Sequence, residues 1–297
     1  MGFQNNMWII KNRVIFISIS ILFVLTSLFL IMKNGLHFGI EFKGGSLTEV
    51  EYIDARPTVA EINARVEKLS FGEFVVQPTE TNGVFVKTRS LEESERVALI
   101  NSLSLDGQEK LTQKAFTSIG PSVGKELQKK SIIALIVVSF ATILFIAYAF
   151  RGVSKPVSSW KYGIIAIITL VHDVIVATGV FTLMGSEVDT LFVVALLTIL
   201  GLSVNDTIVV FDRVRENITR KSSTDFKEVV GKSLTETYAR SINTSLSTII
   251  VLLALFFFGP ESTKVFAMTL AAGMFFGSYS SVFLASPLLV LFKPKEE

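Results

Sequence analysis

The chain has 297 residues, half of them hydrophobic and 25 of them phenylalanine, and its mean hydropathy of +0.55 is that of a membrane protein rather than a soluble domain. The formal net charge is +2 and cysteine is absent, which excludes disulfides, thiolate metal sites and cysteine nucleophiles. Two isolated histidines argue against a zinc site. We therefore expect no metal, no cofactor and no enzymatic activity.

Six apolar segments are long enough to cross a membrane, since a helix needs about 20 residues to span about 30 Å of hydrocarbon. These predicted spans are 14–32, 131–150, 162–184, 189–210, 242–259 and 265–292. Lysines and arginines gather in the segments on the N-terminal side of the membrane, whereas the short loops on the other side hold only Lys264. The positive-inside rule then predicts that both termini are cytoplasmic, including the 293–297 tail.

The first region, residues 1–32, combines a short cytoplasmic N-terminus with the first span. Its apolar stretch is too long for a signal peptide, and it ends in MKNG without a small-residue cleavage site. We expect an uncleaved membrane anchor.

Residues 33–130 switch from helical to strand periodicity, which predicts a small folded domain outside the membrane. SLTEVEYI alternates as a strand, and a helical pattern follows from Pro57. FVVQP and VFVKT flank Asn82 and Gly83, which tolerate the positive φ of a tight hairpin. A helix at LEESERVALINSL and a strand at LTQKAFTSI complete the order βαββαβ, which favours a ferredoxin-like α+β domain. Its balanced charges argue against nucleic-acid binding.

The remaining spans form a predicted bundle over 131–292, and two of them carry ionisable residues where lipid disfavours them. His172 and Asp173 lie in the middle of span three, and Asn205 and Asp206 lie near the cytoplasmic end of span four. A charge at bilayer depth costs at least a few kcal/mol, so such residues usually pair or line an ion path. The pattern predicts a membrane machine driven by ions.

Helical spacing predicts which polar residues share a face. One stripe of span five contains Arg240, Asn243, Thr244, Ser247 and Thr248. In span four, Thr198 and Gly201 share a face with Asn205, with Asp206 at its edge, and in span three Thr169 lies one turn from Asp173. We predict that these strips face a common interior, where Arg240 pairs with the Asp206 carboxylate and releases it on protonation.

The charged segment between spans four and five, 211–241, is predicted to be cytoplasmic. Its mixture of charged and apolar residues indicates a separate amphipathic helix over 212–240 at the membrane surface.

Four motifs follow one another along the chain: FGIEFKGGSLTEVEY after span one, IGPSVGKEL before span two, VHDVIV in span three and SVNDTIVVFDRVREN leaving span four. Together they resemble the SecF family of protein-export membrane proteins, within the RND superfamily. The motif residues with expected structural roles are Glu41, Gly44, Gly45, Gly120, Pro121, Asp212 and Arg213. Many family members carry aspartate at the position of Glu41, which keeps the charge.

The resemblance implies an α-helical polytopic protein with six transmembrane helices, half of an RND architecture, in a bacterial or archaeal cell membrane. It implies that the chain partners SecD, engages the SecYEG translocon with YidC- or YajC-type accessory subunits, and contacts unfolded preprotein and membrane lipid. The proton-motive force would promote late, ATP-independent stages of translocation. Asp206 and Arg240 are implied to use the proton, Asp173, Asn205 and His172 are further ion-coupling candidates, and the coupling ion is either H⁺ or Na⁺.

Each ionisable candidate also has a plain structural interpretation. Asp206 and Arg240 can form a static bridge between helices. His172 can hydrogen-bond a neighbouring helix, and Asp173 can orient Arg240 or satisfy a polar packing contact.

The glycines and the function as a whole have alternatives too. Gly44 and Gly45 favour a backbone turn over a ligand site. Gly273 and Gly277 favour close helix packing, with contact to SecD as the alternative. An RND-type permease for a small hydrophobic molecule and a passive translocon assembly factor remain open as functions.

Overall fold

The computed structural model describes residues 7–79, 82–151 and 157–292. It divides into two compact units. The helical unit consists of Met1–Leu36, Ile133–Ser186 and Leu191–Glu297, and the α+β unit consists of His37–Ile132 and Glu187–Thr190. Each unit has its own hydrophobic core.

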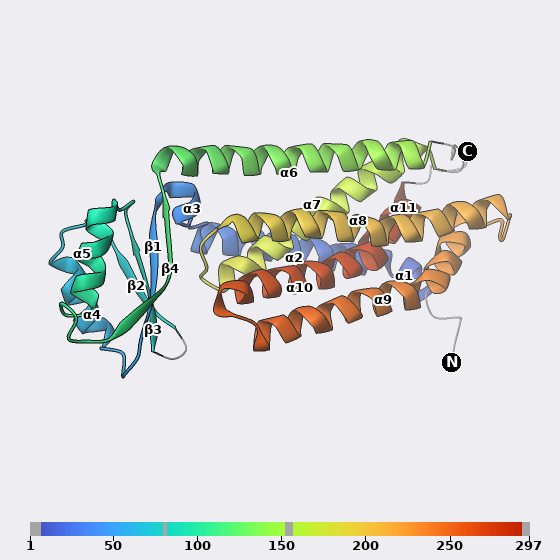
Figure 1. The fold of residues 1–297 in the computed structure, drawn as a ribbon. Coiled ribbons are helices and arrows are strands. Elements are labelled where there is room, and N and C mark those ends of the chain that lie inside the picture. Colours follow the sequence, from blue (N-terminus) through green and yellow to red (C-terminus); the bar gives the residue numbers. More distant parts are fainter. Residues whose placement is uncertain (1–6, 80–81, 152–156, 293–297) are drawn as a thin grey trace. The chain divides into compact units, whose positions relative to one another are not determined.

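Six helices of the described residues are long and apolar enough to cross a membrane (Figure 1). They are α2 (Arg13–Asn34), α6 (Pro121–Ala149), α7 (Ser159–Leu183), α8 (Thr190–Thr219), α9 (Phe226–Phe258) and α10 (Glu261–Ser280). The short helix α1 (Met7–Lys11) precedes them, and α10 continues through a π-helical turn, η1 (Ser281–Ala285), into α11 (Ser286–Leu291). The prediction of a six-span helical membrane protein is confirmed.

The π-helical turn has a local cause in the sequence. Pro287 has no backbone N–H, so the carbonyl four residues before it loses its helical partner. The Ser286 hydroxyl donates to the Ser281 carbonyl at 3.2 Å, five residues earlier, and the Ser281 hydroxyl donates to the Gly277 carbonyl at 3.0 Å. These side-chain bonds reach the carbonyls of Ser281 and Gly277, not the carbonyl that Pro287 leaves without a donor, and they lie where the helical pattern widens.

The prediction of a separate helix over 212–240 is wrong. α8 continues to Thr219, and α9 begins at Phe226 after a turn. Ion pairs between Arg215 and Asp212, and between Arg220 and Glu216, stabilise the charged end of α8. The charged segment therefore extends two membrane helices beyond their apolar parts instead of forming a helix of its own.

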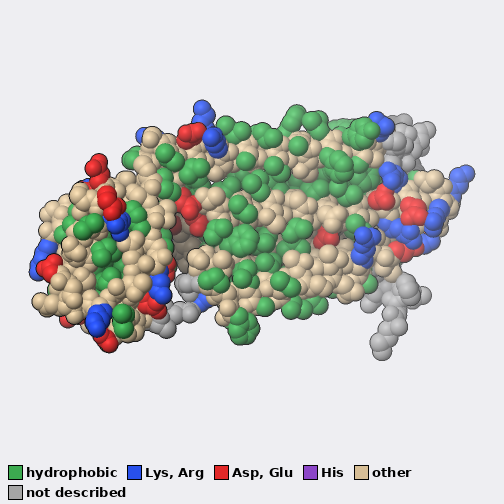
Figure 2. Space-filling view, in the orientation of Figure 1, with side chains coloured by type: hydrophobic (Ala, Val, Ile, Leu, Met, Phe, Trp, Pro, Cys, Tyr) green, Lys and Arg blue, Asp and Glu red, His purple; other side chains and the backbone are tan. Residues whose placement is uncertain are grey.

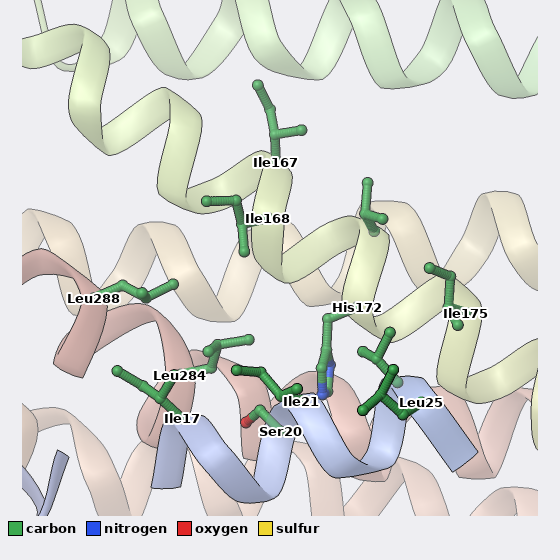
Figure 3. Close-up of a pocket in the computed structure, with 12 residues that line it drawn as sticks. Ile17, Ser20, Ile21, Leu25, Ile167, Ile168, His172, Ile175, Leu284 and Leu288 are labelled. Atoms are coloured by element: carbon green, nitrogen blue, oxygen red, sulfur yellow. The ribbon is translucent and has the colours of Figure 1, made fainter. Parts of the chain in front are cut away.

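The surface of the helical unit is apolar. Figure 2 shows hydrophobic side chains over its visible face, with lysines, arginines and acids gathered at its helix ends. α6 is the most exposed of the six helices, since only 6% of its most hydrophobic stretch is buried within the chain. Side chains of α2, α7, η1 and α11 also border an apolar groove (Figure 3). Such a surface is stable only in hydrocarbon or against another apolar surface.

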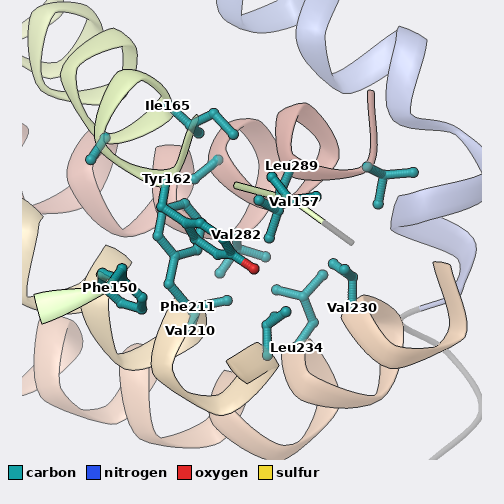
Figure 4. Close-up of a cluster of buried hydrophobic side chains, with 14 of the residues drawn as sticks. Phe150, Val157, Tyr162, Ile165, Val210, Phe211, Val230, Leu234, Val282 and Leu289 are labelled. Carbon is teal, nitrogen blue, oxygen red and sulfur yellow. The ribbon is translucent and has the colours of Figure 1, made fainter. Parts of the chain in front are cut away.

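The core of the helical unit includes a cluster of aromatic rings where α6 ends and α7 begins (Figure 4). Phe150 and Tyr162 stack with ring centroids 5.2 Å apart, and Phe211 meets Tyr162 edge to face at 5.2 Å. All three side chains are fully buried. Such pairs contribute about 0.5–1.5 kcal/mol beyond the area that they bury, so the cluster fixes α6, α7 and α8 to one another at this end.

The α+β unit follows the predicted order. Its elements are α3 (Ile40–Lys43), β1 (Gly45–Tyr52), α4 (Val59–Glu67), β2 (Val75–Pro78), β3 (Gly83–Thr88), α5 (Glu93–Leu103) and β4 (Leu111–Ile119). The sheet order is β2-β3-β1-β4, and all neighbouring strands are antiparallel. A capping box between Thr58 and Glu61 starts α4. The ferredoxin-like topology predicted from the strand and helix patterns is confirmed.

Candidate functional site

Asp173 is the centre of a buried polar cluster in the helical unit. It lies on α7 and is 0% exposed. Its carboxylate accepts hydrogen bonds from the Ser280 hydroxyl of α10 at 2.9 Å, from the Ser203 hydroxyl of α8 and from His172 Nδ1 at 2.9 Å. A buried carboxylate is tolerated when hydrogen bonds replace its hydration. Asp173 thus joins three helices, and His172 turns its Nδ1 toward the same carboxylate.

Gly273 and Gly277 allow α10 to approach α8 closely. A Cβ atom at Gly273 would lie 2.2 Å from Ile199 Cδ1, and one at Gly277 would lie 3.2 Å from Ser203 Cβ. Real Cβ atoms do not come within 2.2 Å of another heavy atom, so a side chain at position 273 would push α10 away from α8. In this structure the glycine pair therefore serves helix packing within the chain, which also keeps Ser280 near Asp173.

Asp206 forms a second buried polar site, on α8. Its side chain accepts a hydrogen bond from Ser245 Oγ of α9 at 3.2 Å and is 7% exposed. Next to it, the hydroxyls of Thr207 and Ser281 are 2.9 Å apart, which links α8 to η1. One hydroxyl donor satisfies only part of a carboxylate, so Asp206 has fewer hydrogen bonds than Asp173.

Arg240 does not bond Asp206 directly. Among the described residues no hydrogen bond or ion pair joins the two. The Arg240 side chain instead lines a polar cleft of about 410 Å³ between α8 and α9. Its other lining residues are Val209, Asp212, Arg213, Glu216, Glu236 and Thr237. The structure thus shows the two residues near each other and unbridged.

Two of the predicted polar strips lie on the surface of this chain and do not face its interior. Asn205 and Gly201 of α8 are exposed, as are Arg240, Asn243 and Thr244 of α9. The buried polar residues are instead Ser203, Asp206, Thr207 and Asn217 on α8 and Ser233, Thr237, Ser241 and Ser245 on α9. The four-residue spacing of that α9 series is the signal that sequence reasoning missed, because small residues at such spacing mark a helix contact.

In span three the predicted face is correct. Thr169 and Asp173 are both buried and lie one turn apart on α7. The hydroxyl of Thr169 donates to the Ala166 carbonyl at 2.9 Å, so it does not take part in the Asp173 cluster.

The FGIEFKGG motif has a structural role that its sequence alone did not predict. The Glu41 carboxylate accepts a hydrogen bond from the backbone N–H of Thr190 at 2.6 Å and one from the Thr190 hydroxyl. Because Thr190 is the first residue of α8, Glu41 caps that helix. Two backbone bonds hold the same junction, from Gly39 N to the Val188 carbonyl at 2.9 Å and from Val188 N to the His37 carbonyl at 2.6 Å.

Gly44 and Gly45 make a backbone turn. Their φ angles are +83° and +154°, which residues with a side chain rarely adopt. A Cβ at Gly44 would lie 2.7 Å from Pro121 Cα, and one at Gly124 would lie 2.9 Å from Gly44 N. The first two family motifs therefore pack against each other. Gly120 has open space where a Cβ would be, so nothing in its surroundings requires glycine.

The last motif ends in a charged cluster. Arg213 donates through Nε to Glu236 at 2.6 Å and also pairs with Glu216, while Asp212 pairs with Arg215. Asn217 donates to Ser233 Oγ at 2.9 Å and to Glu236 at 2.8 Å. These contacts fasten the end of α8 to the start of α9. No group of three or more His, Cys, Asp or Glu side chains in the described ranges is placed to hold a metal ion.

Comparison with known proteins gives the family. The family model "Protein export membrane protein SecD/SecF, C-terminal" matches residues 100–295, and the "SecD/SecF GG Motif" model matches residues 29–52. The protein translocase subunit SecF of Thermobaculum terrenum is 38% identical, over 97% of this chain and 94% of that protein. The SecF subunit of Anaerolinea thermophila is 36% identical, with the same coverage.

Longer relatives contain SecD and SecF in one chain. The protein translocase subunit SecDF of Brucella abortus is 29% identical over 94% of this chain and 36% of its own length. The crystal structure of SecDF from Thermus thermophilus, a translocon-associated membrane protein, superposes with a TM-score of 0.82 at 29% identity. That match covers 96% of this chain but only 38% of the SecDF chain. The chain therefore belongs to the SecF family of protein-export membrane proteins, as a multi-pass subunit of a protein translocase.

Proposed function

We propose that this chain acts with a SecD subunit to couple a transmembrane ion gradient to late, ATP-independent translocation of preproteins through SecYEG. The observation that carries the proposal is Asp206, a nearly buried carboxylate in a membrane helix with one hydroxyl donor and an unbridged arginine nearby. A buried acid with few hydrogen bonds can exist with or without a proton, because burial disfavours its charge whereas a positive charge nearby favours it. No cofactor, metal or enzymatic step is required, and the coupling ion is H⁺ or Na⁺.

The energy in the gradient is sufficient for such a cycle. One charge crossing 100 mV releases about 2.3 kcal/mol, which shifts a two-state equilibrium by roughly fifty-fold. The two states would differ in whether Arg240 reaches the Asp206 carboxylate. In the structure the side chains are apart, with Arg240 in the polar cleft. His172 and Asp173 form a second ionisable pair on α7, in which the Asp173 carboxylate already has three hydrogen-bond partners.

The exposed polar faces of α8 and α9 support a partner subunit. Asn205 and Gly201 on α8, and Asn243 and Thr244 on α9, lie on the surface of this chain at membrane depth. Exposed amides in hydrocarbon are costly, so a second protein surface should cover them. The SecD part of the longer relatives is the natural occupant, since SecD and SecF occur there as one chain.

The proposal also includes the orientation of the chain in the membrane and the proteins that surround it. Both termini would lie in the cytoplasm of a bacterial or archaeal cell, as the distribution of basic residues predicts. The α+β unit would then face outward, where it can hold an emerging polypeptide. Accessory subunits of the YidC or YajC type would join the assembly with SecYEG.

Membrane vesicles that contain the chain with SecD and SecYEG test the coupling. Preprotein translocation is started with ATP, ATP is removed, and completion is measured with and without an ion gradient. We expect gradient-dependent completion in the wild type and its loss in Asp206→Asn, which keeps the shape but not the charge. Asp225→Asn is the matched control, because it removes a carboxylate that caps α9 while asparagine still caps well.

Two results would contradict the proposal. Equal completion by the wild type and Asp206→Asn in a gradient would leave Asp206 structural and favour a passive assembly factor. Failure to co-purify with SecD and SecYEG, combined with stabilisation by small hydrophobic molecules, would favour a permease.

A further inference from the structure

An apolar groove of about 450 Å³ runs along the helical unit between α2, α7 and the η1–α11 segment (Figure 3). Its walls are aliphatic, with Ile17 from α2, Ile168 from α7 and Leu288 from α11 among them. The two polar residues that border it, Ser20 and His172, are only 1% and 3% exposed. The groove therefore presents hydrocarbon to whatever lies in it. Its volume is in the range of small-ligand sites.

The groove has the length of the hydrocarbon layer of one membrane leaflet. Along α2 its wall extends from Ile17 to Leu25, which is about 12 Å at 1.5 Å per residue, and along α7 it extends equally far, from Ile167 to Ile175. Half of a bilayer core is about 15 Å thick. Ile21 and Leu25 are each more than half exposed, so the groove opens toward lipid. A single acyl chain of one leaflet matches it in chemistry and in length.

Arg13 lies at one end of the groove without a counter-ion. It is one turn before the wall residue Ile17, on the same side of α2. Its Nη1 donates to the Ile10 carbonyl at 3.4 Å, and its Nε is buried without a hydrogen-bond partner. In the described ranges no acid pairs with this partly exposed side chain. A guanidinium that is partly desolvated and unpaired attracts an anion.

Lys161 approaches the same end of the groove from α7. It lies two turns before the wall residue Ile168, on the same side of the helix. Its ammonium donates to the Phe292 carbonyl at 2.8 Å, and Phe292 follows the wall residue Leu288 by one turn. That bond uses one of three donors, and no acid in the described part of the chain pairs with Lys161. The walls of the groove thus lead to two cations that lack a counter-ion.

This end of the helical unit is positively charged at the depth of lipid headgroups. Residues 1–40 contain no aspartate or glutamate, and neither do residues 127–172, so the segments that carry the two cations bring no acid of their own. Trp8 and Trp160 are 57% and 61% exposed beside them in the chain. Tryptophan is enriched at the membrane–water interface. An anion in the headgroup layer complements this end of the protein.

We propose that this site binds one anionic phospholipid, with an acyl chain in the groove and the phosphate at Arg13 and Lys161. A guanidinium can pair two N–H groups with two phosphate oxygens, and an ammonium adds a further contact. The acyl chain distinguishes this ligand from free phosphate, which has nothing to place in the groove. The inference does not depend on the ion-driven cycle proposed above, because the lipid binds without a gradient.

The exposed side chains around the groove favour a lipid over a partner subunit. On α8 and α9, exposed amides such as Asn205 and Asn243 require a protein surface at membrane depth. The face around the groove exposes Ile21, Leu25 and Val171 instead. Lipid tails are as apolar as these side chains, so this face needs no protein to cover it.

Photo-labelling tests the proposal on the full chain with its SecD partner in nanodiscs of phosphatidylcholine. The probe is phosphatidylglycerol with a diazirine in one acyl chain. Unlabelled phosphatidylglycerol, unlabelled phosphatidylethanolamine and water-soluble glycerol phosphate compete with it. We expect adducts on the peptides that contain 17–25 and 167–175. Phosphatidylglycerol should compete about tenfold better than phosphatidylethanolamine, because two cations select for its net charge, and glycerol phosphate should not compete.

Two pairs of variants separate the headgroup contact from the chain contact. Arg13→Gln should reduce the preference for phosphatidylglycerol about five-fold, whereas Lys33→Gln, at the other end of α2, should leave it unchanged. Ile168→Trp fills the groove and should abolish labelling of 17–25, whereas Ile136→Trp, at an exposed position on α6, should not.

Four results would overturn the proposal. Equal competition by the two phospholipids would remove the charge contact, and competition by glycerol phosphate would leave an anion site that does not use the groove. Full labelling of Ile168→Trp would place the acyl chain elsewhere. Labelling that occurs only when SecD is omitted would show that the partner subunit covers the groove.

Discussion

The two units of this molecule satisfy the same physical requirement in opposite ways. In the α+β unit, aliphatic side chains such as Ile62 and Leu99 are fully buried, and charged pairs such as Lys114–Glu51 lie at the surface. In the helical unit, the carboxylates of Asp173 and Asp206 and several hydroxyls are buried, while Ile136 is 63% exposed. Water surrounds the α+β unit, whereas hydrocarbon surrounds the helical unit. Apolar packing holds both units together, and in the membrane unit buried polar contacts between helices add to it.

The largest loss of stability is expected when the Asp173 carboxylate is removed from the helical unit. Asp173→Ala leaves the Ser203 hydroxyl and Nδ1 of His172 without their acceptor, while the Ser280 hydroxyl keeps only the Gly277 carbonyl at 3.0 Å. We expect the free energy of unfolding to fall by about 3–5 kcal/mol, because each buried donor that loses its acceptor costs about 1–3 kcal/mol and a cavity remains. Denaturant unfolding of the purified protein in detergent measures it.

The matched control for that change is Asp212→Ala, an exposed carboxylate paired with Arg215 on the same helix as Ser203. Its effect should be below about 1 kcal/mol. If Asp173→Ala and Asp212→Ala destabilise the protein equally, the buried cluster does not hold the helices.

The second prediction compares the same substitution in both units. Ile62→Ala removes a fully buried side chain from the core of the α+β unit and should cost about 2–5 kcal/mol. Ile136→Ala removes an exposed side chain from α6 and should change stability by less than about 0.5 kcal/mol in lipid. Thermal unfolding in nanodiscs measures both, and a larger loss for Ile136→Ala would show that α6 is packed against protein.

The third prediction concerns the cap that Glu41 provides for α8. Glu41→Gln weakens a charged cap by about 1 kcal/mol, so amide exchange at 190–193 should accelerate roughly five-fold. Glu41→Asp keeps the charge and should restore most of the protection. Glu73→Gln, at an exposed position in the same unit, is the control. Unchanged exchange in Glu41→Gln would show that the backbone bonds of Val188 suffice.

The smallest effect is expected at Tyr52, whose hydroxyl donates to the Leu103 carbonyl at 3.2 Å. Burial raises the pKa of Tyr52 to about 12, above its unfolded value of about 10. The folded state thus keeps the proton longer, so stability is intact below pH 10 and declines between pH 10 and 12.

Tyr52→Phe should remove that decline. It should cost under about 1 kcal/mol at pH 8, because Arg65 still donates to the Leu103 carbonyl at 2.9 Å. Urea unfolding at pH 8 and pH 11 gives both numbers. A decline above pH 10 that persists in Tyr52→Phe would assign it to another group.

Local sequence patterns were enough to predict the fold. The alternation of SLTEVEYI, the Asn82–Gly83 turn and the helical faces of α4 and α5 specified the order of the α+β unit, because each pattern reflects neighbours in the chain. The six spans followed from hydropathy alone. The prediction of a separate helix over 212–240 was wrong, because ion pairs one turn apart allow a membrane helix to continue into water.

The direction of polar faces could not be predicted in the same way. A polar stripe such as that of Asn243 and Thr244 shows that a helix face must be covered, but not by which chain. Ser241 and Ser245 lie on the buried face instead. The four-residue spacing of Ser233, Thr237, Ser241 and Ser245 carried the information on direction. The bond from Thr190 to Glu41 spans 149 positions, beyond the reach of any local pattern.

That long span has a consequence for biosynthesis. The segment Glu187–Thr190 belongs to the same compact unit as His37–Ile132, yet the ribosome makes it only after α6 and α7. At about 5–20 residues per second, the nascent sheet domain waits several seconds for its last piece. During that interval the Glu41 carboxylate and the backbone of His37 and Gly39 have no partner from 187–190. Closure of this junction therefore reports that the first three membrane helices, α2, α6 and α7, have been made and that α8 has begun, and an assembly stalled before it leaves this part of the sheet domain incomplete.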